Sequence, residues 1–405
     1  MEAAIVNIVI AGAGQAGGRA SEALRAAGFA GAITMIGEET HYPYERPQLS
    51  KQFLSDRTSQ VAYLRSADAW RGVLDIDVIT GHAIVDCDAR KRIVATRDGR
   101  HFPYDRLLIA TGTQPRRIRA IEGTSARIQY LRSVEDALAL RESLHSQSRV
   151  VVLGGGVIGL EAACAAAKQG CDVTVVEGEA RLLARAFPKI ISDFVEAKHR
   201  AHGVKFVFGE TVVSGIDNGV RLSNGGELAA DILLVGIGVE PSTAVAEQLG
   251  LTIRGGIEVD AFGRTADPAI YSAGDVALQW SHCHQRAMRI ETWANAQNQA
   301  ACVAGNMIGI AREYVDPPWF WTDQYDLNIQ VVGDPTRGDH VVRGDVGSGR
   351  FSLIALRDGA VAGAVSINAA KDMAMLRRLA GKPAKLDRSN LESPSFDLRH
   401  VLKSN

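Results

Sequence analysis

The sequence predicts an α/β fold with two Rossmann-like dinucleotide-binding domains and a C-terminal α+β domain. Two observations predict the dinucleotide-binding domains. An apolar strand pattern followed by glycines at G-x-G-x-x-G spacing occurs at residues 12–17 and again at 154–159. A third observation predicts the last domain, because after residues 316–318 (DPP) the sequence changes to short alternating strands separated by glycine turns.

Length and composition place the chain among globular proteins with more than one domain. Its 405 residues suggest about two to three domains, and 46% hydrophobic with 22% charged residues is ordinary for such proteins. The net charge of −1 argues against a general nucleic-acid or anionic-membrane binder. No apolar stretch reaches transmembrane length. The apolar run near the N-terminus leads straight into a glycine motif, which predicts a strand and not a signal peptide.

The five cysteines predict reduced thiols and therefore a cytoplasmic protein. No two of them form a C-x-x-C pair or a pair with metal-ligand spacing. The triplet His282-Cys283-His284 would need a distant fourth partner to hold an ion, so we interpret it as an exposed loop. No metal site is expected.

The first glycine motif lies in a complete strand–helix–strand unit. A strand over residues 5–11 precedes it, a helix follows to about Gly28, and a second strand covers 32–37. In this pattern the first glycine allows a sharp turn, the second lets the backbone approach a pyrophosphate, and the third lets helix and strand pack closely. An acid about 20 residues beyond the motif binds a ribose. The residues in these positions are Gly12, Gly14, Gly17 and Glu38.

The segment 42–51 (YPYERPQLSK) carries two prolines, which exclude a helix interior. One interpretation is a surface loop with solvated charges. The other interpretation returns Arg46 and Lys51 over the cofactor bound at the first motif, where a cation would offset pyrophosphate charge or polarise a flavin.

The second glycine motif has the same context as the first. A buried strand over 150–153 precedes Gly154, Gly156 and Gly159, a helix follows, and the strand 172–177 ends on Glu177. The helix N-terminus offers free N–H groups and the positive end of the helix dipole to phosphates.

The remaining elements join these motifs into domains. A strand over 270–273 delivers Gly274 and Asp275 at its carboxyl end, where ligands of α/β proteins bind. The other expected elements are strands within 78–96, a buried strand over 104–112, helices over 133–144 and 188–202, a strand over 204–208, a meander over 211–228, a buried strand over 231–236, a helix over 290–309, strands within 328–367, a helix over 370–380 and a polar tail. The predicted domains are residues 1–110 with 240–315, residues 111–239, and residues 316–405.

The chain resembles the FAD-dependent NADH:ferredoxin reductases of bacterial multicomponent oxygenase systems, which are flavoproteins with two dinucleotide-binding domains and a glutathione-reductase-like fold. The resemblance covers nearly the whole chain. The stretches that carry it are GAGQAG at 12–17, ERPQLSK at 45–51, YLRSVEDA at 130–137, GGGVIGLE at 154–161, VGIGVEP at 235–241, SAGDV at 272–276, ETWANAQNQ at 291–299 and PWFWTDQYD at 318–326.

The resemblance implies that FAD binds at the first motif. The glycine loop would hold the pyrophosphate, Asp275 the ribityl chain or its phosphate, and Trp293 would lie against the isoalloxazine. Core packing is the alternative for Trp293, a surface charge for Arg132 and a turn residue for Asp275. The full implied set is Gly12, Gly14, Gln15, Ala16, Gly17, Glu38, Arg46, Lys51, Ile84, Thr111, Gly112, Arg132, Gly274, Asp275, Glu291, Thr292 and Trp293.

The resemblance also implies that NADH binds at the second motif. Glu177 would bind the adenosine ribose and favour NADH over NADPH, because a carboxylate repels a 2′-phosphate by about 1–4 kcal/mol at 4 Å. Arg181 and Arg185 are close enough in sequence to weaken this preference. The full implied set is Gly154, Gly156, Val157, Ile158, Gly159, Glu161, Glu177, Arg185, Gly236, Ile237 and Gly238.

Lys51 and Glu161 are the implied catalytic pair. The resemblance implies that they pair beside the flavin and hold charge near N5, where the reduced flavin carries extra negative charge. The alternative for Glu161 is an acid favoured by the dipole at a helix N-terminus.

Electrons are expected to leave the flavin without thiol chemistry, because residues 38–60 contain no cysteine. The resemblance implies a small acidic [2Fe–2S] ferredoxin as the acceptor. A candidate docking surface lies within residues 371–388, and the alternative there is an ordinary solvated helix face. Its cations are Lys371, Arg377, Arg378, Lys382, Lys385 and Arg388, against Asp372 and Asp387.

Three other functions stay open from the sequence. The first is a rubredoxin reductase or a reductase of a P450 system, which differs only in its partner. The second is an NADH oxidase, against which the missing cysteine argues. The third is an NADH-sensing flavoprotein that binds nucleic acid, against which the near-neutral charge argues.

Overall fold

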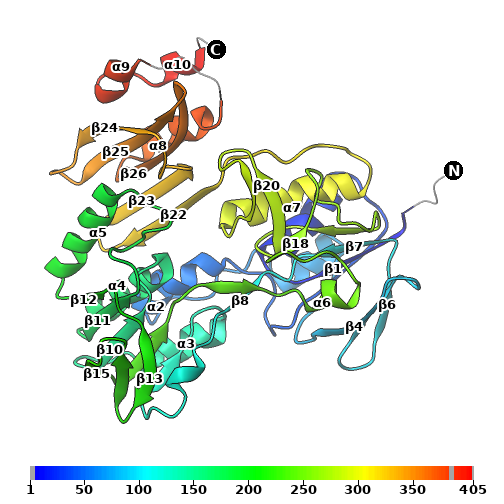
Figure 1. The fold of residues 1–405 in the computed structure, drawn as a ribbon. Coiled ribbons are helices and arrows are strands. Elements are labelled where there is room, and N and C mark those ends of the chain that lie inside the picture. The colour runs from blue at the N-terminus through cyan, green and yellow to red at the C-terminus, as the bar shows by residue number, and fades with distance from the viewer. Residues whose placement is uncertain (1–4, 383–386, 404–405) are drawn as a thin grey trace. The chain divides into compact units, whose positions relative to one another are not determined.

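The computed structural model describes residues 5–382 and 387–403 (Figure 1). Contacts divide the chain into two compact units. Unit 1 comprises Met1–Arg46, Val61–Gln114 and Glu240–Pro318, and unit 2 comprises Pro47–Gln60, Pro115–Val239 and Trp319–Asn405. The chain passes between the units after residues 46, 60, 114, 239 and 318. The crossings after 114 and 239 lie in the short strands β8 (Thr113–Pro115) and β17 (Val239–Pro241).

Unit 1 is built on a five-stranded parallel sheet with the order β19-β7-β1-β2-β3. Side chains of β1 alternate between two cores: Ile8 and Ile10 face one cluster, and Val9 and Ala11 face the other. The strand is therefore apolar on both faces, as expected for a parallel sheet covered on both sides. The strands are β1 (Asn7–Ala11), β2 (Ala32–Ile36), β3 (Asp77–Ile79), β7 (Arg106–Ile109) and β19 (Ile270–Ser272).

Helices α1 (Gln15–Ala26) and α7 (Trp293–Met307) pack against each other over one face of this sheet (Figure 1). Smaller elements complete unit 1: η2 (Ala69–Val73), β4 (Ile84–Asp88), β5 (Ile93–Thr96), β6 (His101–Pro103), α6 (Ala244–Gln248), β18 (Ile257–Glu258), β20 (Ala277–Ser281) and β21 (Arg286–Arg289).

The first part of unit 2 repeats the same plan. Its parallel sheet has the order β12-β11-β10-β16-β9. A capping box formed by Ser133 and Asp136 fixes the start of α3 (Val134–Ser143). The other elements are α2 (Gln52–Ser55), β9 (Arg127–Gln129), β10 (Arg149–Leu153), α4 (Val157–Lys168), β11 (Asp172–Glu177), α5 (Lys189–Ala201), β12 (Lys205–Phe208), β13 (Val212–Ile216), β14 (Gly219–Leu222), β15 (Glu227–Ala229) and β16 (Ile232–Val235).

The C-terminal part of unit 2 is an antiparallel sheet with the order β22-β23-β26-β25-β24. One face packs on the region of α5, where Phe187 and Ile191 join Ile329 and Phe351 in one core. Helix α8 covers the other face (Figure 1). The elements are β22 (Trp319–Gln324), β23 (Leu327–Gly333), β24 (Asp339–Asp345), β25 (Arg350–Arg357), β26 (Ala360–Ile367), α8 (Ala370–Leu379), α9 (Arg388–Glu392) and α10 (Arg399–Lys403).

The predicted fold class is confirmed, and several local expectations need correction. The expected loop at 42–51 contains a 3₁₀ helix, η1 (Arg46–Ser50). The expected polar tail contains the two short helices α9 and α10. Their placement has a physical reason: Leu391 and Leu398 are buried, and the buried guanidinium of Arg343 donates to main-chain carbonyls of this segment.

Two further differences concern packing. Residues 47–60 belong to unit 2, although they fall within the range 1–110 predicted for the first domain, because Leu54 joins a core there. The triplet 282–284 forms the turn of the β20–β21 hairpin, but Cys283 is buried and the loop is not fully exposed. The assignment of a cofactor to each predicted domain stays a prediction.

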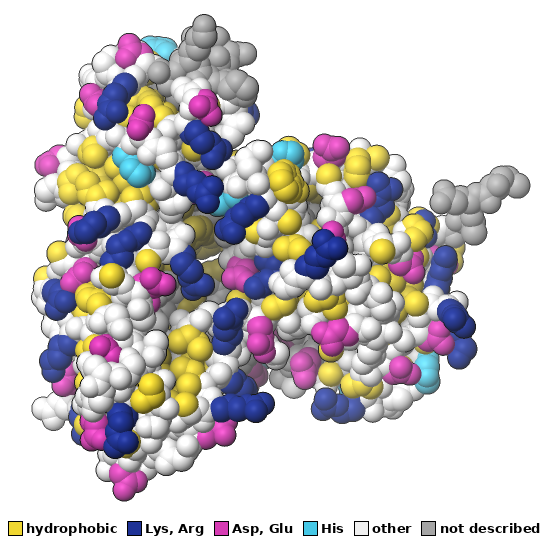
Figure 2. Space-filling view, in the orientation of Figure 1, with side chains coloured by type: hydrophobic (Ala, Val, Ile, Leu, Met, Phe, Trp, Pro, Cys, Tyr) yellow, Lys and Arg dark blue, Asp and Glu magenta, His cyan; other side chains and the backbone are white. Residues whose placement is uncertain are grey.

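Charge of both signs is spread over the surface, with Lys and Arg interspersed with Asp and Glu on the face in Figure 2. Among the described residues, no helix combines the length and the apolar character needed to cross a membrane.

Candidate functional site

Two glycines of the first motif are required by the protein's own backbone. Gly12 has φ of +118°, and a Cβ added there would lie 2.3 Å from the carbonyl oxygen of Ala110. A Cβ on Gly17 would lie 1.9 Å from the carbonyl oxygen of Gly12. In the second motif, the corresponding Gly154 and Gly159 are equally constrained.

The middle glycine of each motif is different. Gly14 and Gly156 occupy the N-cap positions of α1 and α4 with φ of −94° and −82°, which any residue can adopt. A Cβ at either position would meet no described heavy atom within 4 Å. The space above both helix N-termini is therefore open in the folded chain. This geometry fits a pyrophosphate at each motif, because the phosphate would take the place of a side chain.

The two acids that follow the motifs differ in their surroundings. Glu177 is half-buried and accepts hydrogen bonds from the main-chain N–H groups of Gly155 at 2.6 Å and Glu179 at 2.8 Å. Its carboxylate is thus fixed against the second loop. Glu38 is exposed after the end of β2.

Glu39, which the sequence reasoning did not single out, organises the segment after β2. Its carboxylate accepts hydrogen bonds from the Tyr44 hydroxyl and from Arg46, both at 2.6 Å. Burial acts to lower the pKa of Arg46, but Tyr44, Glu39 and Asp275 outweigh it and raise that pKa above its usual value. The structure therefore brings Arg46 near Asp275, and both lie in unit 1. The sequence signal that could have indicated Glu39 is its position as a second acid directly after the expected Glu38.

The carboxyl end of β19 lies beside the first motif. Gly274 has φ of +80°, and a Cβ there would approach the Cβ of Ala16 to 3.0 Å. The main-chain N–H of Gly274 donates to Gln299 on α7 at 2.9 Å. Asp275 is half-buried, and its main-chain oxygen accepts from Arg289 at 3.2 Å.

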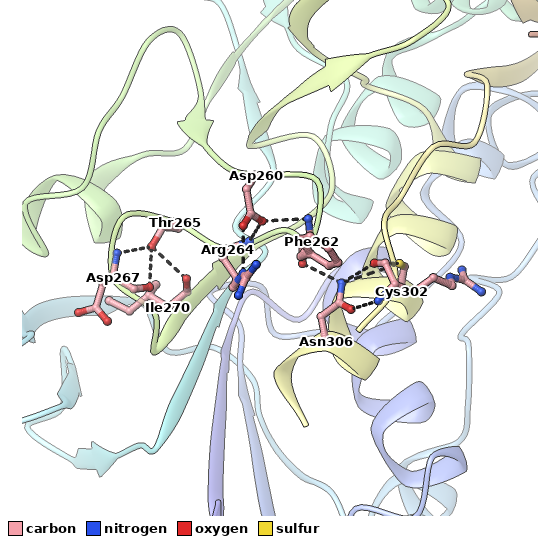
Figure 3. A network of polar contacts seen from close by, with 9 residues as sticks. Asp260, Phe262, Arg264, Thr265, Asp267, Ile270, Cys302 and Asn306 are labelled. Carbon is pink, nitrogen blue, oxygen red and sulfur yellow. Dashed lines mark hydrogen bonds and ion pairs between the residues drawn. The ribbon is translucent and has the colours of Figure 1, made fainter. Parts of the chain in front are cut away.

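A polar network holds the segment that leads to β19 (Figure 3). The Asp260 carboxylate accepts from the main-chain N–H groups of Phe262 and Arg264, both at 2.9 Å. Asn306 at the end of α7 donates to the carbonyl oxygen of Phe262 at 2.9 Å (Figure 3). These bonds tie the segment before β19 to α7, the helix that begins at Trp293.

The remaining residues predicted at FAD in unit 1 lie as follows. Thr292 caps α7 and accepts from the Asn295 N–H at 3.1 Å, and the Trp293 indole donates to Glu45. Gln15 on α1 donates to Gln297 on α7 at 3.2 Å, so the two helix N-termini lie together. The other positions are the exposed Glu291, which pairs with Arg289 at 2.5 Å, Thr111, whose hydroxyl donates to Ser242 at 2.7 Å, Gly112 with φ of +68°, and the half-buried Ile84 of β4.

Lys51 and Glu161 form the ion pair that was expected, and both lie in unit 2. Glu161 is 2% exposed on α4. It also accepts hydrogen bonds from the hydroxyls of Ser50 and, at 2.6 Å, of Thr322. Three donors therefore compensate this buried charge, as burial requires. The sequence reasoning missed Ser50 and Thr322, although both stand in quoted stretches.

Two basic residues follow the second motif. The guanidinium of Arg181 is held by the protein, because it donates to the carbonyls of Phe187 and Ala184 and to the Ser192 hydroxyl. Its effect on the preference for NADH stays a prediction. Arg185 is exposed and lies beside Gly238: a Cβ added to Gly238 would be 4.0 Å from Nη2 of Arg185.

Two of the apolar residues predicted around the second motif are exposed. Ile158 and Ile237 are 46% and 37% exposed. Large exposed apolar side chains that flank an open helix N-terminus fit a surface covered by a ligand. Val157 is half-buried against the core shared with the C-terminal sheet, and Gly236 follows β16.

Two residues predicted at FAD lie in unit 2. They are Lys51 and Arg132, and the main-chain N–H of Arg132 donates to Asp136 at 2.9 Å beside the start of α3. Their contact with FAD stays a prediction, as do the ligand roles of the other residues named above.

Comparison with known proteins gave two family matches. The model of the pyridine nucleotide-disulphide oxidoreductases matches residues 6–300, and the model of the reductase C-terminal domain matches residues 319–402.

Characterised relatives match over nearly their full length. The ferredoxin--NAD(+) reductase component of the p-cumate 2,3-dioxygenase system of Pseudomonas putida is 41% identical, over 98% of each chain. The corresponding component of the anthranilate 1,2-dioxygenase system of Burkholderia cepacia is 39% identical, over 97% of this chain and 98% of its own. A crystal structure of a covalent putidaredoxin reductase–putidaredoxin complex matches with a TM-score of 0.92 and 32% identity, over 99% of each chain. These matches confirm the resemblance indicated by the motifs.

Proposed function

The chain belongs to the pyridine nucleotide-disulphide oxidoreductase family, and we propose that it is an FAD-containing reductase that takes hydride from NADH and passes single electrons to a [2Fe–2S] ferredoxin. The ferredoxin would serve an oxygenase of the aromatic-ring dioxygenase or P450 type. One observation carries the proposal: a single chain has two glycine loops, each with open space above a helix N-terminus. Relatives named as ferredoxin reductase components, which match over 98% and 97% of the chain, support it.

Each open loop has a proposed ligand. FAD would be held in unit 1 by the loop around Gly14, with Asp275 and Arg46 beside it and Trp293 against the ring system. NADH would be held in unit 2 by the loop around Gly156, with Glu177 on its adenosine ribose. FAD, when bound, supplies a centre that accepts hydride from NADH and releases electrons singly.

Lys51 is the proposed charge-holding residue. Its ammonium group is fixed by Glu161, which is itself held by Ser50 and Thr322. A fixed cation stabilises negative charge without reorganising when that charge develops. Lys51→Ala should therefore slow flavin reduction or raise the KM for NADH by about tenfold or more. Stopped-flow rates equal to those of the parent protein would remove Lys51 from the reaction.

Electron transfer without a protein thiol is part of the proposal. All five cysteines are free and none lies in residues 38–60. This arrangement disfavours an NADH oxidase that works through a redox cysteine. The free thiols also support a cytoplasmic location.

The proposal is tested by cytochrome c reduction with NADH, with and without candidate [2Fe–2S] ferredoxins. We expect strong stimulation by a ferredoxin and little oxygen consumption in its absence. Stimulation only by a rubredoxin would indicate the alternative partner. Rapid oxygen consumption without a carrier would indicate an NADH oxidase, and a long-lived reduced state that no carrier reoxidises would indicate a sensing flavoprotein.

The proposed docking surface for the acidic ferredoxin is the end of α8, where Arg377 and Arg378 are exposed. The guanidinium of Arg377 lies 4.0 Å from the ring centroid of Trp319. Asp372 does not cancel this charge, because it pairs with Arg343 at 3.2 Å. Lys385, also named for this surface, lies outside the described residues.

Charge reversal tests this surface. Arg377→Glu combined with Arg378→Glu should raise the KM for ferredoxin at low salt, less so at high salt, and leave ferricyanide reduction unchanged. The matched control is Arg221→Glu, which reverses an exposed arginine on β14. Equal losses with ferredoxin and ferricyanide would contradict a docking role.

A further inference from the structure

A chain of hydrogen-bonded side chains runs from Glu161 through the C-terminal sheet to α5. The Thr322 hydroxyl lies 2.6 Å from Glu161, and the Gln324 amide nitrogen lies 3.0 Å from the Thr322 oxygen. The Gln324 amide oxygen lies 2.8 Å from Nε2 of His199, whose Nδ1 lies 3.3 Å from the Tyr325 hydroxyl. Thr322, Gln324 and His199 are each at most 1% exposed.

The charge on Glu161 fixes the direction of every bond in this chain. A carboxylate paired with Lys51 can only accept, so Thr322 must donate its single hydrogen to it. The Thr322 oxygen must then accept from the amide nitrogen of Gln324. The amide oxygen of Gln324 is left as an acceptor, so His199 must carry its proton on Nε2. The Tyr325 hydroxyl then donates to the bare Nδ1.

We propose that Thr322, Gln324 and His199 are positioning residues, which act as one polarised chain that holds the Glu161 carboxylate against Lys51. The proposal rests on the function proposed above for Lys51. The four donors are the side chains of Thr322, Gln324, His199 and Tyr325, and each donates towards the Glu161 end. Their dipoles therefore add, and the hydrogen bonds strengthen one another. The C-terminal sheet thereby contributes to the charge site through β22, in addition to any role in docking.

The remote end of the chain is held in place. His202 stacks on the Tyr325 ring with centroids 3.7 Å apart, and the main-chain N–H of Tyr325 donates to the Cys164 sulfur at 3.1 Å. Burial, opposed in part by the bond to Gln324, lowers the pKa of His199 to about 4. The imidazole is therefore neutral at physiological pH, as a single fixed tautomer requires.

The first experiment determines the direction of the hydrogen bonds from the tautomer of His199 and does not depend on activity. Nitrogen-15 NMR of the histidine-labelled holoprotein, with His199 assigned through His199→Gln, should show the Nε2–H tautomer from pH 8 down to pH 5. An Nδ1–H tautomer, or an imidazolium at pH 6, would overturn the proposal. This result does not depend on whether NADH reduces the protein.

The second experiment reads the effect on the charge site. Thr322→Val should slow flavin reduction at saturating NADH roughly tenfold, because a donor to a buried charge is lost, and Thr322→Ser should restore it. Gln324→Glu offers Thr322 a second carboxylate and should also slow reduction, although it keeps the side-chain shape. The matched control is Thr336→Val, which removes a threonine bond to the buried carboxylate of Asp334 in the connection between β23 and β24.

The outcomes separate the two proposals. If Thr322→Val and Gln324→Glu both keep the parent rate while Lys51→Ala is reduced slowly, the proposed positioning role of the hydrogen-bonded side chains is refuted. The proposed function then stays intact. A holoprotein that NADH does not reduce at all would refute the proposed function, while the tautomer would still decide the direction of the chain.

Discussion

At the scale of single residues, Glu177 is the strongest candidate for choosing the nucleotide. Its carboxylate is fixed by two main-chain N–H groups, and the neighbouring Arg181 is engaged with carbonyl groups. Glu177→Gln should raise the ratio of kcat/KM for NADPH over NADH by about tenfold, because the charge repulsion disappears while an acceptor for the loop remains. Steady-state kinetics with both nucleotides measures this, with the exposed Glu179→Gln as control. An unchanged ratio would contradict the role of Glu177.

The sequence pattern itself predicted residues whose role is local. The long-range pair of Lys51 and Glu161 was expected only from the family resemblance, and the bonds of Ser50 and Thr322 to Glu161 were missed. The glycines and Glu177 were found because a fixed spacing along one strand–loop–helix unit defines them. The hydroxyl of Thr322 could not be assigned to Glu161, because the two residues are 161 positions apart and no motif links them. Glu39 was passed over for Glu38 because spacing alone does not tell which of two adjacent acids turns inward.

At the scale of elements, different glycines of each strand–loop–helix unit are required by the fold and by the proposed ligand. Gly14→Ala should keep the stability of the apoprotein but lower its FAD content, because the added methyl occupies only the open space above α1. Gly17→Ala should destabilise unit 1 by several kcal/mol, roughly the cost of overpacking, because its Cβ would collide with the oxygen of Gly12. Flavin absorbance and thermal unfolding measure the two effects.

The change in the second unit that corresponds to Gly14→Ala is the internal control. Gly156→Ala should leave the flavin content unchanged and raise the KM for NADH, because it fills the open space above α4. Loss of FAD in Gly156→Ala, or full FAD in Gly14→Ala, would contradict the assignment of one ligand to each loop.

Helices and strands could be predicted where an apolar pattern and a glycine motif indicated the same element. They were harder to predict where tertiary packing determines the local structure. The central strands of both parallel sheets, β1 and β10, follow from continuous apolar runs, whereas the edge strand β9 was not predicted, because its three residues include Arg127 and Gln129. The helices α9 and α10 could not be predicted from their polar composition, since the buried Arg343 and two leucines hold that segment in place. Propensity was overridden there by tertiary contacts.

At the scale of the whole molecule, the chain order of segments does not match their grouping in space. Residues 47–60 lie between two segments of unit 1, yet they belong to unit 2, where Leu54 enters a core and Lys51 meets Glu161. An apolar residue in a short segment does not reveal which of two cores will bury it. The two glycine motifs predicted two dinucleotide-binding folds, but they did not predict which of the two folds packs against residues 47–60.

Acid sensitivity of unit 2 is the expected consequence of burying His199. Its pKa in the folded protein is about 4, chiefly because of burial, whereas an unfolded histidine titrates near ~6.5. Between these values the unfolded chain binds a proton that the folded chain does not. The free energy of unfolding should therefore fall as the pH drops from about 6.5 to about 4, by up to ~3 kcal/mol from this group, and no further below that.

Hydrogen exchange can localise this loss. Protection of amides in α5, corrected for intrinsic rates, should fall between pH 7 and pH 5 more than protection in α1 of unit 1, which serves as the internal control. In His199→Gln the difference between the two helices should vanish, because the group that binds the extra proton in the unfolded chain is gone. Equal pH dependence of α5 in the parent protein and in His199→Gln would show that His199 is not the source, and would count against a neutral imidazole at the end of the polarised chain.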